Sequence, residues 1–153
     1  MELPEHISID TLKFTQEIML ELSAAATGLI AHNREYLDNI LKGGETYYGI
    51  NTGFGSLCNV RIKDDALSQL QENLVCSHAC GMGDEVPQEI VRLMLLLKIH
   101  GLSQGYSGVR TEIVQRLADF YNHKITPVVY ELGSLGASGD LAPLAHLCLP
   151  ILG

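Results

Sequence analysis

A mainly α-helical fold with a few short strands is predicted by three features of the sequence. Hydrophobic residues make up 46% of the 153 residues and charged residues only 18%, which supplies ample apolar material for a buried core. Apolar residues recur every three or four positions over several long segments. Ser, Pro and Gly stand where these segments begin and end. Since 153 residues is close to the usual size of one domain, a single domain is expected.

The first long helix is predicted over residues 24–42, after an opening segment of mixed strand and helix character. Ser23 is placed to cap its first turn, and Gly43-Gly44 end it. One face is apolar and comprises Leu29, Ile30, Tyr36, Leu37, Ile40 and Leu41. Residues 47–59 then alternate glycine, asparagine and aromatic residues, which is typical of a shaped loop.

Two helices are predicted in the middle of the chain. Asp64 or Asp65 is expected to cap the first, in which an apolar stripe of Leu67, Leu70 and Leu74 continues to His78. This spacing predicts that His78 points inward. Pro87 is suited to the first turn of the second helix. Its residues 90–99 leave almost no polar face, so we expect other elements to surround it.

The last third of the chain predicts two more helices and a strand. Residues 101–108 indicate a helix end and turn, and an amphipathic helix follows over 111–123. Residues 125–130 favour a short strand. The final helix is predicted to begin at Asp140 and is still apolar at Gly153. An open apolar helix needs a cover, which predicts a truncated product or one chain of an assembly.

The charge balance disfavours binding to nucleic acid or to an anionic membrane. Ten basic and 18 acidic residues give a net charge of −8, and no run of Lys or Arg occurs. The longest apolar stretch, 93–99, contains Lys98 and is far shorter than the roughly 20 residues that span a bilayer. We therefore expect a small molecule or another protein as the partner.

The cysteines and the amino terminus favour a cytoplasmic protein. The chain has four cysteines, Cys58, Cys76, Cys80 and Cys148, too few and too unevenly spaced for a disulfide scaffold. The first five residues carry two acids where a secretory signal would be basic. The Cys76, His78 and Cys80 triplet does not predict a zinc site, because His78 lies roughly 200° around a helix from Cys76.

The segment Gly133-Ser-Leu-Gly-Ala-Ser-Gly-Asp140 holds six small residues in eight and points to chemistry. It lacks the lysine and the spacing of a phosphate-binding loop, and its last residue departs from the Gly-x-Ser-x-Gly serine elbow. A third interpretation is cyclisation of the backbone. The Gly139 amide nitrogen can attack the Ala137 carbonyl with loss of water. Loss of a second water from Ser138 would leave an electrophilic methylidene group.

Three segments resemble the aromatic amino-acid ammonia-lyases. Gly133 to His146 is similar to the prosthetic-group segment of that family, and Tyr48-Gly-Ile-Asn-Thr-Gly-Phe-Gly55 resembles its second diagnostic loop. Cys76-Ser-His-Ala-Cys-Gly81 resembles the segment that lines the pocket for the substrate side chain. The resemblance covers all 153 residues but only about the first third of a family chain. It implies that residues 1–153 form the amino-terminal part of the histidase/fumarase-like helical bundle. This part would end within the helix that follows the prosthetic-group segment.

The resemblance implies a reaction, a prosthetic group and site residues. Ala137, Ser138 and Gly139 would form 4-methylidene-imidazol-5-one (MIO), with Asp140 assisting ring closure and no external cofactor or metal. Among family members the histidine-specific ones are most similar, which implies elimination of ammonia from L-histidine to give urocanate. Tyr48 would be the base that removes the β-proton, and His78 would contact the substrate imidazole. A tyrosine hydroxyl has a reference pKa of about 10, so such a base needs neighbouring positive charge or donors.

The resemblance also implies a homotetramer for the full-length protein, with active sites shared between subunits, and an isolated segment without activity. Three alternatives stay open. The first is a tyrosine or phenylalanine ammonia-lyase or aminomutase of the same family. The second is a catalytically inert segment that acts as a folding or assembly module. The third is a serine hydrolase that uses Ser138.

Overall fold

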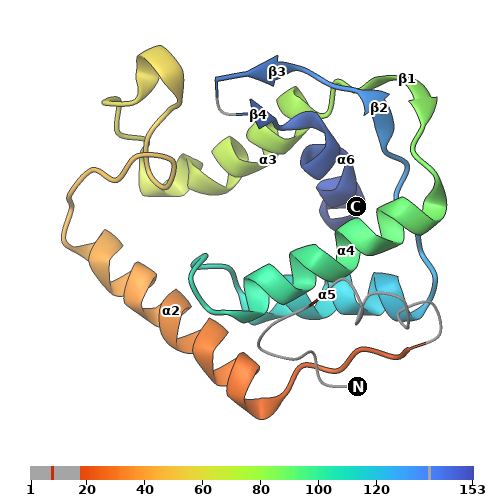
Figure 1. Cartoon of the computed structure of the whole chain (residues 1–153). Coiled ribbons are helices and arrows are strands. Elements are labelled where there is room, and N and C mark those ends of the chain that lie inside the picture. The colour runs from red at the N-terminus through yellow and green to blue at the C-terminus, as the bar shows by residue number, and fades with distance from the viewer. Residues whose placement is uncertain (1–7, 9–17, 138) are drawn as a thin grey trace.

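The computed structural model describes residue 8, residues 18–137 and residues 139–153. The opening segment therefore lies largely outside the described residues, as does Ser138. The helices are α2 (Ala24–Lys42), α3 (Leu67–His78), α4 (Gln88–Ser103), α5 (Thr111–Asn122) and α6 (Ala142–Leu152), with 3-10 turns η2 (Gly55–Leu57) and η3 (Asp64–Ala66). The strands are β1 (Met82–Glu85), β2 (Tyr130–Leu132), β3 (Leu135–Gly136) and β4 (Gly139–Asp140). The mainly helical prediction is confirmed (Figure 1).

The core lies mainly between α4 and α5, which pack side by side (Figure 1). Both helices contribute completely buried aliphatic side chains, among them Leu95, Ile99, Val114 and Leu117. Leu147 of α6 is also completely buried in this core. The amphipathic pattern over 111–123 therefore predicted α5 and its buried face correctly.

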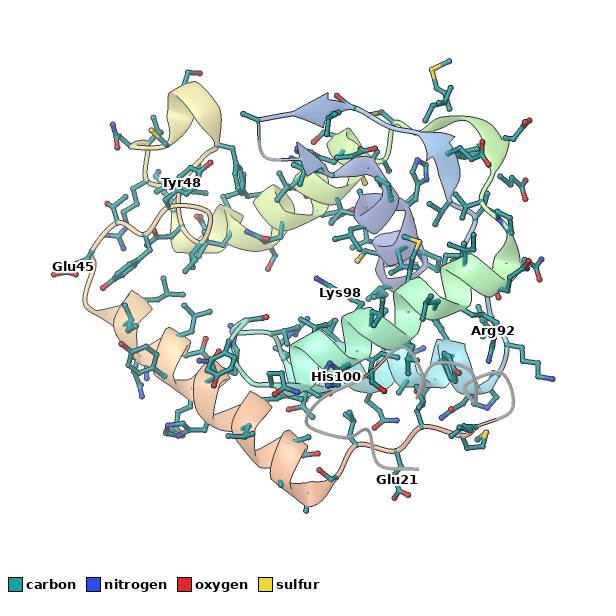
Figure 2. The ribbon with its side chains drawn as sticks, viewed as in Figure 1. Glu21, Glu45, Tyr48, Arg92, Lys98 and His100 are labelled. Atoms are coloured by element: carbon teal, nitrogen blue, oxygen red, sulfur yellow. The ribbon has the colours of Figure 1, made fainter. Side chains whose placement is uncertain are left out.

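A cation and an aromatic ring join α4 to the end of α5. The Arg92 guanidinium lies 4.3 Å from the centroid of the Tyr121 ring and donates a hydrogen bond of 3.0 Å to the Tyr121 carbonyl (Figure 2). A cation above an aromatic face is attracted by the ring quadrupole. Arg92 thus adds a side-chain donor to a carbonyl in the last turn of α5 that also accepts a hydrogen bond from the Lys124 amide.

Helix α2 agrees with its predicted bounds but buries little of its apolar face. Ser23 is its N-cap, and the Ser23 hydroxyl accepts a hydrogen bond of 3.1 Å from the Ala26 amide. Ile30 is the buried residue of the helix, whereas Leu29 is 53% and Tyr36 62% exposed. The predicted apolar face is therefore covered only in part by the described residues.

Replacing Ser23 by alanine is expected to lower the free energy of unfolding by about 1 kcal/mol, because the Ala26 amide loses its acceptor. Thermal unfolding of the Ser23→Ala protein measures the effect. Ser23→Asn, which keeps a side-chain acceptor, should stay close to the parent. Equal unfolding temperatures for the alanine variant and the parent would show that the cap contributes nothing.

The strands differ from the prediction. Residues 125–129 have no regular structure, and the strand β2 covers Tyr130–Leu132 instead. Its antiparallel partner β1 was not predicted, because four exposed residues that include Gly83 show no alternation of apolar and polar side chains. The two strands form a ribbon whose register is irregular between Met82 and Glu85.

Helix starts also differ from the prediction. The turn η3 precedes α3, and the N-cap position of that helix is Ala66, so the prediction that Asp64 or Asp65 occupies it is wrong. Helix α6 begins at Ala142 rather than Asp140, because Asp140 belongs to β4. Helix α4 is not fully surrounded by the described residues, since Ile90 and Leu97 are 47% and 46% exposed. No helix in the described part of the chain is long and apolar enough to cross a membrane.

Candidate active site

The loop that carries Tyr48 is held by a buried asparagine. Asn51 is 1% exposed, and its Oδ1 accepts a hydrogen bond of 2.7 Å from the Tyr47 amide. Its Nδ2 donates a bond of 2.9 Å to the Glu45 carbonyl. Since the Asn51 side chain binds backbone groups on the amino-terminal side of Tyr48, it fixes the path by which the chain enters that residue.

A second buried polar side chain closes the same loop. The Thr52 hydroxyl accepts a hydrogen bond from the Gly49 amide and donates one to the Gly53 carbonyl. Gly49 has a φ of +75°, in the left-handed region that favours glycine, which is why this residue type follows Tyr48. The Tyr48 ring itself is 65% exposed and contacts Phe54 edge to face, with centroids 5.8 Å apart (Figure 2).

The adjacent tyrosine is chemically different. The Tyr47 hydroxyl donates a hydrogen bond of 2.8 Å to Glu45, and this bond, with the nearby Glu45 charge, raises the pKa of Tyr47 above its usual value. A raised pKa makes a tyrosinate harder to form. Tyr47 is therefore a poor candidate for a base.

Replacing Asn51 by alanine is expected to destabilise the protein by about 1–3 kcal/mol. The half-buried Tyr47 amide would lose its partner at about that cost, whereas water can replace the Asn51 amide at the carbonyl of the exposed Glu45. Denaturation by guanidinium measures the loss. The exposed Asn59→Ala variant is the control and should change stability by less than about 0.5 kcal/mol. Similar losses for both variants would contradict a clamping role for Asn51.

His78 is the last residue of α3 and is half-buried, so it points only partly inward. Its Nδ1 lies 2.8 Å from the Leu74 carbonyl oxygen and 3.1 Å from the Ser77 hydroxyl. Because a carbonyl oxygen can only accept, the shorter contact puts a proton on Nδ1. In the neutral ring, Nε2 is then the acceptor, a suitable group for a donor N–H on a ligand.

The segment around Ala137 and Gly139 forms a tight hairpin. Strands β3 and β4 pair Leu135 with Asp140 and Gly136 with Gly139, so the chain reverses within two residues. Gly139 has a φ of +91°, and no atom within 4 Å would meet a Cβ at this position. Glycine is therefore needed here for its backbone conformation. Ala137 is exposed.

The Asp140 carboxylate braces this hairpin from inside. Its Oδ1 accepts hydrogen bonds from the Ser134 amide at 3.0 Å and from the Ala142 amide at 3.1 Å. Ala142 begins α6, so the carboxylate also serves that helix N-terminus, where negative charge is favourable. A Cβ on Gly133 would overlap the same carboxylate. A side chain at position 133 would therefore force the Asp140 carboxylate to move from its present position.

The structure joins two of the three predicted site segments directly. The Gly81 amide, three residues after His78, donates a hydrogen bond of 2.8 Å to Nε2 of His146 in α6, the helix that follows the hairpin. Within the part of the chain that the structure describes, no hydrogen bond or ring contact joins the Tyr48 side chain to either of the other two segments. In the view of Figure 1, all three lie in the upper half of the molecule. Sequence reasoning placed Asn51, Gly133 and His146 within the diagnostic segments but assigned none of them a role, although a histidine within an apolar helix was a usable signal.

The thiols are the remaining candidate groups in the described part of the chain. Among the described residues, no group of three or more His, Cys, Asp or Glu side chains could hold a metal ion. Burial raises the pKa of the Cys148 thiol, against the opposing charge of Lys98 on α4 (Figure 2). A partly buried thiol with a raised pKa is a poor nucleophile.

Comparison with known proteins places the chain in a family. A family model described as "Aromatic amino acid lyase" matches residues 8–153. The chain belongs to the aromatic amino acid lyase family. The histidine ammonia-lyase of Legionella pneumophila (strain Corby) is 48% identical over 152 residues, which are 98% of this chain and 30% of that protein. This member of the aromatic amino acid lyase family therefore spans about a third of the length of that relative.

Solved structures of lyase relatives share the fold. The tyrosine aminomutase from Streptomyces globisporus superposes with a TM-score of 0.88 at 30% identity, over 96% of this chain and 28% of that one. The histidine ammonia-lyase from Trypanosoma cruzi superposes with a TM-score of 0.81 at 35% identity, over 96% and 28%. These matches confirm the predicted fold and the predicted family resemblance.

Proposed function

We propose that the complete protein containing this chain is a carbon–nitrogen lyase that eliminates ammonia from L-histidine to give urocanate. The observation that carries the proposal is the braced hairpin at Ala137 and Gly139. The tight reversal, the positive φ of Gly139 and the Asp140 brace suit a tripeptide that must close into a five-membered ring. The histidine ammonia-lyase of Legionella pneumophila, 48% identical, supports histidine as the substrate.

The residues of the hairpin fit the MIO group. Ala137, Ser138 and Gly139 would form it, and when present it supplies an electrophile for the α-amine of the substrate. Gly139 contributes an amide nitrogen with no side chain to hinder its approach to the Ala137 carbonyl. The hydrogen bonds of Asp140 to Ser134 and Ala142 hold both ends of the hairpin while the ring forms.

Two further residues of the chain are assigned to the substrate. The phenolate oxygen of Tyr48, whose own proton would have passed to solvent, accepts the β-proton, and the loop that carries it is held by Asn51 and Thr52. The Nε2 of neutral His78 accepts a hydrogen bond from the N–H of the substrate imidazole, because the proton on Nδ1 is bonded to the Leu74 carbonyl.

We propose that the complete protein is a cytoplasmic homotetramer that uses no metal or external cofactor. The 153 residues alone are expected to be inactive.

The experiment is a spectrophotometric assay of the complete lyase with histidine, tyrosine and phenylalanine, combined with intact mass. Urocanate is expected from histidine, and the mass should be lower by two waters than the sequence requires. Coumarate or cinnamate without urocanate would overturn histidine as the substrate. An unshifted mass in an active enzyme would overturn the MIO group.

A tyrosine-specific lyase or aminomutase is the second candidate. The favouring observation is the TM-score of 0.88 with the tyrosine aminomutase from Streptomyces globisporus, against 0.81 with the histidine ammonia-lyase from Trypanosoma cruzi. Fold similarity reports backbone shape, whereas substrate choice depends on side chains. We therefore place histidine first, and the same assay separates the two.

A further inference from the structure

Helix α6 contains a histidine that takes part in no step assigned so far. His146 is 8% exposed and lies among apolar neighbours in the middle of the helix. Its ring packs edge to face against Tyr130 of β2, with centroids 5.3 Å apart and an interplanar angle of 76°. A buried imidazole is costly to desolvate unless its nitrogens are bonded, so its partners define its role.

The hydrogen bond of His146 fixes its protonation and tautomer. The Gly81 amide donates to Nε2 at 2.8 Å, so this nitrogen accepts and carries no proton. The neutral ring then holds its proton on Nδ1. An aliphatic side chain of similar size could fill the same space but could not accept the amide proton.

Gly81 is fitted to this contact. A Cβ at position 81 would lie 2.8 Å from Nε2 of His146 and 3.1 Å from Cβ of Tyr130, closer than side chains normally approach. The short approach of the Gly81 backbone therefore depends on having no side chain there. His146 and Gly81 form a matched pair that joins positions 65 residues apart.

The segment between His78 and Gly81 is short and internally bonded. The Cys80 amide donates to the His78 carbonyl at 2.9 Å, and the Ala79 amide donates to the Val75 carbonyl at 3.1 Å. A displacement of Gly81 is therefore transmitted to the end of α3, where the His78 ring sits. Helix α6 starts two residues after Asp140, and its first residue, Ala142, donates a hydrogen bond to the Asp140 carboxylate of the hairpin.

We propose that His146 is a positioning residue for the lyase reaction. Its unprotonated Nε2 accepts a hydrogen bond from the Gly81 amide, and this bond keeps His78 correctly placed relative to the hairpin at Ala137 and Gly139. The inference rests on the proposed function, since it concerns how the substrate-binding and ring-forming segments are aligned. His146 acts through Gly81 and does not contact the substrate itself.

The experiment compares His146→Leu with His146→Gln in the complete lyase. Leucine fills the space but cannot accept a hydrogen bond, whereas the glutamine Oε1 can accept one from the Gly81 amide. We expect His146→Leu to raise the KM for histidine by about 10- to 100-fold, because misplaced binding groups lose contacts to the substrate. The kcat should stay within about threefold, and His146→Gln should recover most of the KM. Equal KM values for His146→Leu and the parent, or for the two variants, would overturn the proposal.

A double-mutant cycle tests the contact itself. Gly81→Ala should raise the KM in the parent but have a much smaller effect in a His146→Ala background, where the clash with the ring is gone. Effects that multiply independently would show that His146 and Gly81 are not coupled. The exposed His32→Leu variant is the control and should leave both kinetic constants unchanged.

Intact mass separates this inference from the proposed function. Every His146 variant should show the two-water loss, since the hairpin and its Asp140 brace are untouched. If the parent deaminates tyrosine or phenylalanine in place of histidine, the proposed function fails. The same KM comparison, made with that amino acid, then still decides whether His146 positions the binding segment.

Discussion

Replacing Tyr48 by phenylalanine is expected to lower the kcat of the complete lyase by about 10²- to 10⁴-fold, the usual contribution of a positioned acid or base. The substitution removes one hydroxyl and keeps the ring that packs on Phe54. The KM should change little, because Tyr48 is proposed to remove the β-proton during the reaction and not to bind the substrate. Product absorbance under saturating substrate measures the effect.

The neighbouring tyrosine supplies a matched control. Tyr47→Phe removes a hydroxyl that donates to Glu45, so its kcat is expected to stay within about threefold of the parent. The mass of both variants should show the two-water loss, since neither residue belongs to the tripeptide. A large loss of activity in Tyr47→Phe together with a normal Tyr48→Phe would contradict the assignment of Tyr48 as the base.

Replacing Asp140 by alanine is expected to prevent ring formation in most of the protein. The carboxylate accepts two backbone hydrogen bonds, and bonds to a charged acceptor contribute about 1.5–3 kcal/mol each, less where solvent reaches them. Without this brace, the Ser134 and Ala142 amides no longer hold the hairpin closed. Intact mass should then match the unmodified sequence, and activity should fall by at least about tenfold in proportion to the uncyclised fraction.

Two further variants test whether the loss of ring formation in Asp140→Ala is caused by the missing carboxylate. Gly133→Ala places a Cβ against the same carboxylate and is expected to give the same unmodified mass. Asp84→Ala, an exposed acid on β1, is the control and should retain the two-water loss. Full cyclisation in Asp140→Ala would show that the hairpin reaches the required conformation without its brace.

The sequence predicted best where one local signal determines the structure. Ser23 and Gly43 bound α2 correctly, and the amphipathic pattern over 111–123 identified α5, since helix caps and periodicity depend on near neighbours. The sequence predicted least well the structure of segments that depend on contacts with distant parts of the chain. Strand β1 exists because it pairs with β2, which begins 45 residues after β1 ends, and no local pattern in Met82–Glu85 announces that pairing.

The candidate site shows the same division. Tyr48 and the tripeptide are candidates because of their glycine-rich surroundings, which are a local signal. The apolar stripe predicts that His78 points inward, yet His78 is only half-buried, and the buried, hydrogen-bonded histidine is His146. Sequence spacing could not reveal this, because the partner of His146 is a backbone amide on another element. Similarly, the role of Asn51 depends on backbone atoms that every residue possesses.

The hairpin bonds and the Gly81–His146 bond differ in how far apart their partners lie along the chain. The bonds that brace Ala137 and Gly139 join residues at most six positions apart, whereas Gly81 and His146 are separated by 65. Contacts of short sequence separation close quickly during folding, and those of long separation wait for the rest of the chain. If the tripeptide cyclises as proposed, its ring closure and the alignment of the proposed binding segment are therefore separable events. Substitutions far from the hairpin are then expected to alter selectivity over evolutionary time without preventing ring closure.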